Sequence, residues 1–378
     1  MTARFIDIHA LQTVPYANLN RDDLGTPKTV RFGYTDRTRV SSQCWKRAIR
    51  EELEHRTGDA AKRTRQVPQA VAGRLHERGW EPEAAAFAGE QVMAALATVA
   101  VKTDGLKVDK KTGAAQVLFY LPEKAFDQIA DVCAEHQQQL AAAAGGGKPK
   151  AAILPADRLL TIVATRNPVI NLFGRMLAEL PATNVDGAVQ VAHAFTVHPS
   201  DPQVDFFTAV DDIIRDAEQT GSGHMNSAEF SAGTFYRYAS VNLADLSANL
   251  DGDQHTAAEL TEQFLTAFIT ALPQAKKTST APFTVPDLVY ITVRSDRPLS
   301  LASAFEAPVS AYGANGYAEP ARRQLADYAT RIYQLLGNGG LLHHAHAGID
   351  DKAHDGLGGR TPSFKTLITD AVRRARPA

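Results

Sequence analysis

The sequence predicts an α+β fold whose core elements follow the order β-α-β-β-α-β, with two long insertions between them. Segments rich in β-branched and aromatic residues predict four strands, at residues 3–11, 188–197, 233–243 and 287–294. Amphipathic segments predict one helix after the first strand and another after the third, at about residues 43–56 and 255–272. This order is the ferredoxin-like arrangement, the scaffold that RNA-recognition motifs use. A helical bundle with a small separate sheet is the alternative architecture.

The first insertion, residues 57–186, has helical character through most of its length. Ala-rich stretches at 83–100 and 123–144 predict helices, and a short strand is expected between them at 117–121. The run at 141–150, AAAAGGGKPK, is typical of a flexible linker. We therefore expect a largely helical domain inserted into the β-α-β-β-α-β core.

The second insertion, residues 198–232, connects the second and third predicted strands and is long for a hairpin loop. Within it Phe206, Phe207 and Val210 form an apolar cluster among several carboxylates. An acidic segment would bind phosphates poorly, but its aromatic residues could wedge between bases or dock onto a basic patch of a neighbouring molecule. From the residues alone, the favoured interpretation is that the two phenylalanines anchor the loop to its own core.

The second predicted strand, 188–197, alternates cleanly and predicts one continuous face formed by Val189, Val191, His193, Phe195 and Val197. His9 lies in the first predicted strand. Both histidines are expected to be core or sheet-face residues.

Composition limits the classes of protein that this chain can belong to. Its 378 residues are 44% hydrophobic and 22% charged, as in a soluble globular protein, and no apolar run is long enough to span a bilayer. The first residues lack the apolar core of a signal peptide. The only cysteines, Cys44 and Cys133, belong to no CxxC pair, so a reducing cytoplasm is the expected compartment. The net charge of −2 argues against indiscriminate coating of nucleic acid.

The most informative segment is a basic run, residues 18–50, with a local charge of about +5 in a nearly neutral chain. It contains only three carboxylates. Its eight cations are Arg21, Lys28, Arg31, Arg37, Arg39, Lys46, Arg47 and Arg50. Few acidic residues are expected to pair with them one helical turn away. Such a surface is typical of proteins that bind polyanions.

In the predicted helix at 43–56, the basic and the apolar side chains lie on opposite sides. A helical wheel gathers Trp45, Ala48, Ile49 and Leu53 on one side and Lys46, Arg47 and Arg50 on the other. Ser41 or Ser42 is expected to cap the helix, and the capping serines, Gln43 and the first-turn amides could seat one phosphate. Residues 20–38 are expected to form an irregular loop that lies along a strand.

The C-terminal third predicts helices near 319–336 and 363–376, with a His-rich segment, 343–355, between them. That segment has the residue types of a metal site but no defined spacing, so we expect a solvated surface loop. The paired carboxylates Asp211 and Asp212 are a weak candidate for Mg²⁺ binding. No GxSxG, Walker A or GxGxxG motif occurs, and we expect no catalytic site and no cofactor.

Five segments together resemble a known family, the CasC backbone subunit of type I-E CRISPR Cascade. They are LNRDD (19–23), RVSSQCWKRAIR (39–50), FGRM (173–176), VDFFTAVDD (204–212) and SAEFSAGTFYRYASVNL (227–243). The similarity extends in the family's order to about Phe305. The region beyond about Tyr312 matches poorly, and the resemblance implies nothing there.

The resemblance implies a right-hand-shaped subunit. Its parts would be an RRM-like palm (1–56, 187–198 and 233–378), helical fingers (57–186) and a thumb hairpin (199–232). Several copies would polymerise along the CRISPR RNA with other Cascade subunits, kink the guide periodically and present its bases to target DNA. The resemblance implies that this branch of the family does not cut RNA. It also implies that target cleavage belongs to a separate nuclease-helicase.

The resemblance also implies roles for individual residues. The guide backbone would be bound by Asn20, Arg21, Lys28, Arg39, Ser41, Ser42, Gln43, Lys46, Arg47 and Arg50. Arg175 and Met176 would lie close to the bases, and Phe206, Phe207 and Val210 would form the wedge at the kink. The family commonly has an aliphatic residue in place of Trp45 and a Trp in place of Phe206.

Two alternative functions remain from the sequence. One is a metal-dependent endoribonuclease acting on CRISPR RNA through Asp211, Asp212 or the His-rich segment. The other is a stand-alone RNA-binding module that forms no filament.

Overall fold

The structure is a computed structural model that describes residues 4–109, 111–144, 152–210, 222–313, 315–337 and 339–376. The chain divides into two compact units. The first comprises Met1–Glu52, Val189–Ala244 and Asp253–Ala378, and the second comprises Leu53–Ala188 and Asp245–Gly252. The second unit overlaps the insertion that the sequence predicts at 57–186.

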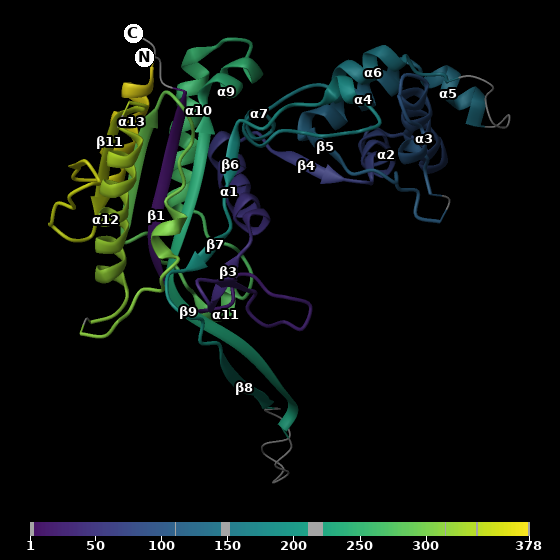
Figure 1. Ribbon diagram of the computed structural model, residues 1–378. Coiled ribbons are helices and arrows are strands. Elements are labelled where there is room, and N and C mark those ends of the chain that lie inside the picture. The colour runs from purple at the N-terminus through teal and green to yellow at the C-terminus, as the bar shows by residue number, and fades with distance from the viewer. Residues whose placement is uncertain are drawn as a thin grey trace. The chain divides into compact units, whose positions relative to one another are not determined.

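A large mixed sheet forms the centre of the first unit (Figure 1). Its strands run in the order β12-β11-β10-β1-β9-β7-β3-β2, with β6 and β8 also paired to β9. Their bounds are β1 Phe5–Ala17, β2 Thr29–Phe32, β3 Thr35–Val40, β6 Val189–Val191, β7 Ala194–Thr196, β8 Gln203–Val210, β9 Ser222–Asn242, β10 Leu288–Arg294, β11 Leu341–Gly348 and β12 Gly359–Arg360. All pairs are antiparallel except β11 with β12. The prediction of an α+β fold is confirmed.

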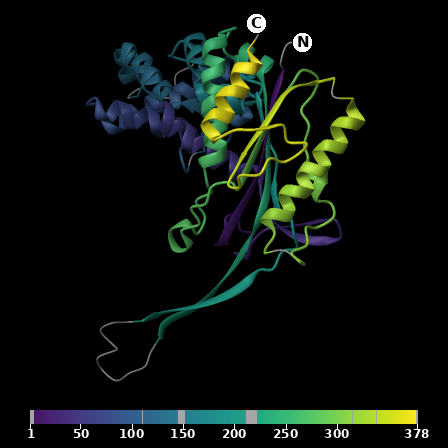
Figure 2. The ribbon, with the colours of Figure 1, turned by 90° about the vertical axis from the view of Figure 1, so that its left-hand side faces the viewer.

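Helices cover both faces of this sheet (Figure 2). The helices of the first unit include α1 Ser42–Thr57, α10 Gln254–Thr270, α11 Lys277–Thr280, α12 Ala318–Leu336 and α13 Phe364–Ala375. Trp45 of α1 and Phe268 of α10 both contact the guanidinium of Arg237 on β9, so these two helices share one face. On the other face α12 packs through Leu325, Ala329 and Tyr333 against the sheet.

His9 is a core residue, as the sequence predicts. Its ring stacks on Tyr238 and Tyr290, with centroids 5.0 and 5.5 Å away, and Nδ1 lies 2.9 Å from the hydroxyl of Tyr236. Burial lowers the pKa of His9 to about 3, so the ring is neutral. Neighbouring Asp7 accepts a hydrogen bond from Tyr238, and burial raises the pKa of Asp7 to about 6. The sheet therefore contains a buried polar network against the α12 face.

The prediction of a solvated loop at 343–355 is wrong for its first half, which belongs to β11. This strand pairs with β10 from Leu288↔Gly348 to Arg294↔Leu341. His344 Nδ1 lies 3.0 Å from the hydroxyl of Tyr290, and His346 Nδ1 lies 3.1 Å from the carbonyl of Leu357. The surrounding glycines indicated a loop, whereas the available edge of β10 supplied hydrogen-bond partners that local sequence does not reveal.

The basic run contains a hairpin where the sequence predicts an irregular loop. Strands β2 and β3 pair from Thr29↔Thr38 to Phe32↔Thr35, and both turn residues, Gly33 and Tyr34, have φ of 61°. Two positive φ values are the signature of a primed hairpin turn. A Cβ at Gly33 would collide with the backbone carbonyl of Glu306, so only glycine fits there. Strands are predicted from alternating apolar and polar residues. These short strands are mostly polar, so the sequence lacks that signal.

The predicted single strand at 188–197 is divided into β6 and β7. Val191 of β6 pairs with Ala239 of β9, and Phe195 of β7 pairs with Tyr236 of β9. Between these two pairs the chain from β6 to β7 advances by four residues, whereas β9 advances by three. The extra residue is a β-bulge at 192–193, which turns His193 outward and leaves it exposed. His193 is therefore not part of the continuous face that the alternation predicts.

The second unit is mainly helical. Its helices are α2 Val67–Glu77, α3 Pro82–Thr98, α4 Glu123–Glu135, α5 Gln137–Ala144, α6 Ala156–Val163 and α7 Pro168–Phe173, with α9 Leu243–Asn249 at its boundary. Strands β4 Ala61–Thr64 and β5 Phe119–Pro122 form a separate sheet. The predicted stretch at 123–144 is two helices, α4 and α5, and most of the expected linker lies outside the described residues.

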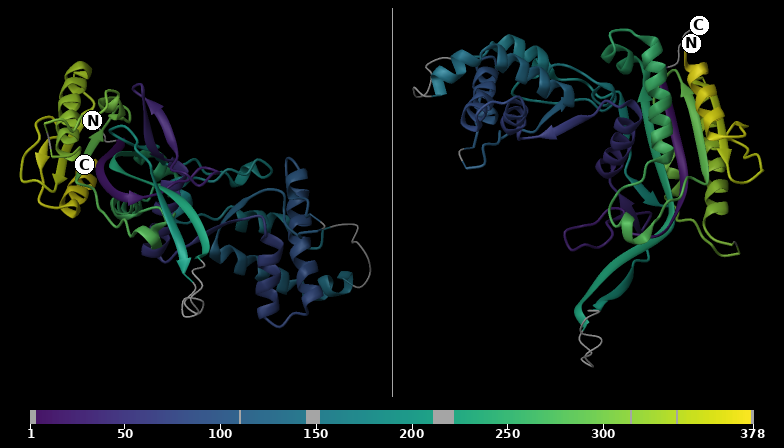
Figure 3. Two further views of the ribbon diagram at one scale, coloured as in Figure 1. Left: turned by 90° about the horizontal axis from the view of Figure 1, so that it is seen from below. Right: turned by 180° about the vertical axis from the view of Figure 1, so that it is seen from behind.

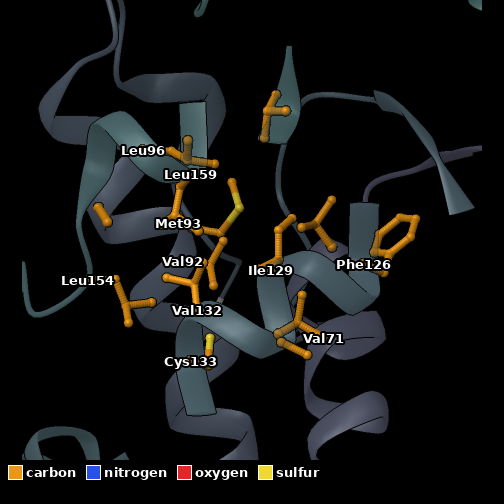
Figure 4. Close-up of a cluster of buried hydrophobic side chains, with 14 of the residues drawn as sticks. Val71, Val92, Met93, Leu96, Phe126, Ile129, Val132, Cys133, Leu154 and Leu159 are labelled. Atoms are coloured by element: carbon orange, nitrogen blue, oxygen red, sulfur yellow. The ribbon is translucent and has the colours of Figure 1, made fainter. Parts of the chain in front are cut away.

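The core of the second unit is formed by side chains from α2, α3, α4 and α6 (Figure 4). Val92 and Leu96 of α3, Phe126 and Ile129 of α4 and Leu159 of α6 all belong to this cluster, and each is at most 3% exposed. Fully burying each such side chain stabilises the fold by about 1.5–3 kcal/mol. Cys133 belongs to the same core, and burial raises the pKa of its thiol to about 12, so the thiol is unreactive.

Truncating this core is expected to destabilise the protein. Ile129→Ala should lower the free energy of unfolding by about 2–4 kcal/mol, because the side chain is fully buried and leaves a cavity. Urea denaturation followed by circular dichroism measures the change. Ile349→Ala is the matched control, since Ile349 is 78% exposed and should shift stability by less than about 0.5 kcal/mol. Equal effects of the two substitutions would contradict the assigned core.

Candidate nucleic-acid interface

Helix α1 begins at a side-chain cap. The hydroxyl of Ser41 accepts a hydrogen bond from the amide of Cys44 at 3.2 Å, so Ser41 is the capping residue. The amide of Ser42 instead donates to Nδ1 of His193 at 3.1 Å. Two first-turn amides therefore already have acceptors within the protein. This corrects the expected phosphate seat, because a bound anion would depend more on side chains than on these amides.

The apolar side of α1 is fixed to the sheet, as the helical wheel predicts. Trp45, Ile49 and Leu53 are at most 2% exposed. The indole of Trp45 packs 3.7 Å from the guanidinium of Arg237, whose Nη1 donates to Oε1 of Gln12 at 2.6 Å. Burial lowers the pKa of Arg237 to about 9, and its side chain remains held between rings. The opposite side of α1 consequently points away from the core.

The side of α1 opposite Trp45 carries Arg47, which is exposed, and Lys46 and Arg50, which are half-buried. Arg47 lies beside Glu51 one turn further on, with Nε 2.8 Å from Oε1, and this hydrogen bond raises the pKa of Arg47. The expectation of few acidic partners at helical spacing is therefore wrong at this position. Exposed ion pairs of this kind contribute about 0–1 kcal/mol, so a phosphate could compete for the guanidinium.

Hydrogen bonds tie the preceding segment to the start of α1. The side-chain oxygen of Asn20 accepts a hydrogen bond from the amide of Ser41 at 2.9 Å. The backbone carbonyl of Asn20 accepts one from the amide of Lys28, also at 2.9 Å. The amide of Arg39 donates in turn to the carbonyl of Lys28 at 2.7 Å. These bonds bring Lys28 and Arg39 next to the first turn of α1. Arg21 and Gln43 are exposed beside them.

Two of the arginines that the sequence analysis singled out are structural. Arg37 is fully buried and donates to the carbonyls of Thr196 and Phe305, each at 3.0 Å. Arg175 is 5% exposed and donates to the carbonyls of Thr183 at 2.7 Å and Thr165 at 2.9 Å. The guanidinium of Arg175 therefore has partners other than those expected from the resemblance.

Burial lowers the pKa of Arg175 to about 10, which still leaves the group charged at neutral pH. The adjacent Met176 is 83% exposed and is accessible to a ligand.

The second insertion forms a hairpin that extends beyond the sheet (Figure 3). Strand β9 runs unbroken for 21 residues, pairing with β1 in the sheet and with β8 in the hairpin. Phe206 is 74% exposed and Phe207 is 44% exposed. The interpretation that they anchor the loop to its own core is therefore wrong. Consecutive strand residues point to opposite faces, so Phe206 and Phe207 lie on opposite faces of the hairpin.

The carboxylates and histidines considered for catalysis form no metal site among the described residues. His354 Nε2 lies 3.3 Å from Asp350, whose other oxygen lies 3.1 Å from Arg322. Asp211 and Asp212 lie outside the described residues, as does the side chain of Val210. Within the part of the chain that the structure describes, none of the helices is long and apolar enough to cross a membrane.

These features define an α+β protein that carries a cationic helix at its sheet and an exposed aromatic hairpin. A family model described as CT1975-like protein matches residues 6–370, and the chain belongs to this family. No curated protein matches the chain.

Chains of two solved structures are similar to this protein over nearly its full length. A chain of a "CRISPR RNA-guided surveillance complex, pre-nicking" is 47% identical, with a TM-score of 0.90, over 98% of this chain and 100% of that one. A chain of a second "CRISPR RNA-guided surveillance complex" is 43% identical, with a TM-score of 0.81, over 98% and 99%. The chain is therefore a homologue of surveillance-complex subunits.

The role of Arg175 can be tested through stability. Arg175→Met should lower the free energy of unfolding by at least about 3 kcal/mol, because several buried carbonyls lose their donor. Chemical denaturation provides the measurement. Met176→Ala is the matched control and should change stability by less than about 0.5 kcal/mol. A stable Arg175→Met protein would show that the carbonyl contacts contribute little.

Proposed function

We propose that this chain is the CRISPR RNA-binding backbone subunit of a type I-E Cascade complex. The observation that carries the proposal is the similarity along the full length to chains of CRISPR RNA-guided surveillance complexes, at 47% and 43% identity. In this role several copies polymerise along the CRISPR RNA, next to other Cascade subunits. The guide is held so that its bases can pair with target DNA, and sequence specificity comes from that pairing.

The strand order supports an RRM-like palm. Neighbours β10, β1, β9 and β6 are antiparallel, and their chain order is the 4-1-3-2 order of a ferredoxin-like sheet. Helices α1 and α10 are the two crossovers, and both contact Arg237 on one face. The strands β11 and β12 extend this palm at one edge. The helical second unit corresponds to the fingers and the β8–β9 hairpin to the thumb.

The basic segment and α1 would bind guide phosphates. The residues proposed for this role are Asn20, Arg21, Lys28, Arg39, Ser41, Ser42, Gln43, Lys46, Arg47 and Arg50. Ser41 and Asn20 act mainly by holding the backbone of this region, since both already form hydrogen bonds at the start of α1. Met176 contacts the bases, whereas Arg175 supports the local fold.

The thumb would insert apolar side chains between bases and so kink the guide at intervals. The exposure of Phe206 and Phe207 supports this role, and Val210 is proposed as the third wedge residue. Aromatic rings stack on any base, so such a wedge works without reading sequence. Repetition of one such contact by each copy would place the kinks at regular spacing.

Head-to-tail association of copies would build the filament. A heterologous interface that does not close generates a helical array. The net charge of −2 suits this arrangement, because acidic parts of one copy can meet basic parts of the next. The function proposed here needs no catalysis and no cofactor. The two unpaired cysteines, Cys44 and Cys133, suit a reducing cytoplasm.

The first test of this function removes two cations from α1. Lys46→Ala with Arg50→Ala should weaken RNA binding irrespective of sequence, and each lost phosphate contact should reduce the log–log salt slope by roughly 0.7. Fluorescence anisotropy at several salt concentrations gives the slope. Arg323→Ala with Arg331→Ala on α12 is the matched control, because both side chains are exposed on another helix. An unchanged slope for the α1 variant would remove this helix from the interface.

The second test concerns the thumb. Phe207→Ala should leave guide affinity nearly unchanged but reduce the periodic distortion, because the phosphate contacts remain while the wedge is shortened. Nuclease protection of CRISPR RNA in the assembled complex reports the distortion as a periodic pattern. Phe283→Ala serves as the control, since Phe283 is 69% exposed outside the hairpin. A footprint identical to that of the unmodified protein would exclude the wedge role.

A further inference from the structure

His193 lies at the β-bulge between β6 and β7 and contacts the basic segment from a distant part of the sequence. Its Nδ1 lies 3.1 Å from Nη1 of Arg39 and 3.1 Å from the amide of Ser42. The imidazole is exposed to solvent on its outer side. One ring atom thus joins the guanidinium of β3 to the first turn of α1.

The identity of the two donors fixes the state of the ring. A backbone amide and a guanidinium can only donate hydrogen bonds, so both donors share the one lone pair of the unprotonated Nδ1 of His193. The ring is then the neutral tautomer that carries its proton on Nε2. Burial and the charge of Arg39 lower the pKa of His193, which keeps the ring neutral at neutral pH. A protonated ring would place an N–H against both donors and lose both bonds.

Strand register explains why His193 reaches these partners. Arg39 pairs with Phe195 and Val40 with Ala194 between β3 and β7, so His193 lies opposite the start of α1. The bulge at 192–193 turns the side chain outward at this point. Without the extra residue of the bulge, successive side chains would keep alternating between the two faces of the sheet as they do in β6. The imidazole of His193 would then not point toward Arg39.

Holding Arg39 has a consequence for ligand binding. A free arginine side chain loses rotamer entropy when a ligand immobilises it. A guanidinium carries five N–H donors, and the bond to His193 uses one of them. The remaining N–H groups can donate two parallel hydrogen bonds to a phosphate. Because the side chain is already held, binding costs less conformational entropy.

We propose that His193 is a positioning residue of the RNA-binding surface, which holds the guanidinium of Arg39 in place at the start of α1 for a guide phosphate. This inference rests on the function proposed above. His193 acts through Arg39 and contributes no charge of its own. A neutral ring is essential to the role, because only the unprotonated Nδ1 can accept.

Two substitutions separate positioning from direct contact. His193→Asn keeps an acceptor at the place of Nδ1 and lacks the outer nitrogen, whereas His193→Gln keeps a polar group at the place of Nε2 and lacks the acceptor. With the full-length protein and a fluorescein-labelled single-stranded RNA, we expect His193→Asn to retain affinity within about twofold. His193→Gln should weaken binding about 3- to 10-fold, as expected for one hydrogen bond that orders a charged group.

A double-mutant cycle with Arg39 tests the route of the effect. In an Arg39→Ala background, His193→Gln should weaken RNA binding by less than about twofold, because its target is already absent. Fully additive losses would overturn the proposal, as would equal losses for His193→Asn and His193→Gln. Thermal unfolding of every variant accompanies the titrations, and affinity loss that follows a fall in Tm in both His193 variants would equally overturn it.

Failure of this inference is distinguishable from failure of the proposed function. If Arg39→Ala and the α1 double variant both leave RNA binding unchanged, the RNA-binding surface itself is wrong. If those variants weaken binding while His193→Gln does not, only the positioning role of His193 is wrong.

Discussion

The packing of Arg237 between Trp45 and Phe268 is the interaction on which the rest of the proposed site depends. A buried guanidinium needs acceptors and favourable surroundings, and here it has the side chain of Gln12 and two aromatic faces. Because these contacts come from α1, α10 and β1, one residue of β9 fixes the rotation of α1 about its axis. The basic side of α1 faces outward for that reason. Loss of this packing would allow α1 to rotate and would move Lys46 and Arg50 together.

The length of β9 links the sheet to the hairpin. The same strand is paired with β1 along Ser231–Asn242 and with β8 along Ser222–Phe230. Tyr16 of β1 stacks on Phe230 at 4.4 Å near the base of the hairpin, so the passage from sheet to hairpin is supported by side chains as well as hydrogen bonds. The proposed wedge would have to keep its direction when it separates stacked bases. A continuous strand provides that direction better than a flexible loop would.

Much of the architecture could be predicted from the sequence because it depends on local periodicity. The order of strands and helices follows from such patterns, and so do the buried side of α1 and the core position of His9. The hairpin at β2–β3 and the strand β11 escaped prediction. Polar and histidine side chains hid their alternation, and each forms because a neighbouring strand offers unpaired hydrogen-bonding groups. The candidate site was predicted less completely than the fold, since Arg175 has structural partners and His193 was assigned to the sheet face.

The sequence by itself determined where the positive charge lies and which side of α1 is apolar, because both are properties of neighbouring residues. Only the tertiary structure decided which arginines are available to a ligand. Arg37 and Arg39 are two residues apart, yet the first donates to the carbonyls of Thr196 and Phe305, while the second contacts a histidine at the bulge between β6 and β7. The same holds for Phe206 and Phe207, whose exposure depends on where the hairpin projects. Such contacts join residues far apart in the chain, and no local pattern encodes them.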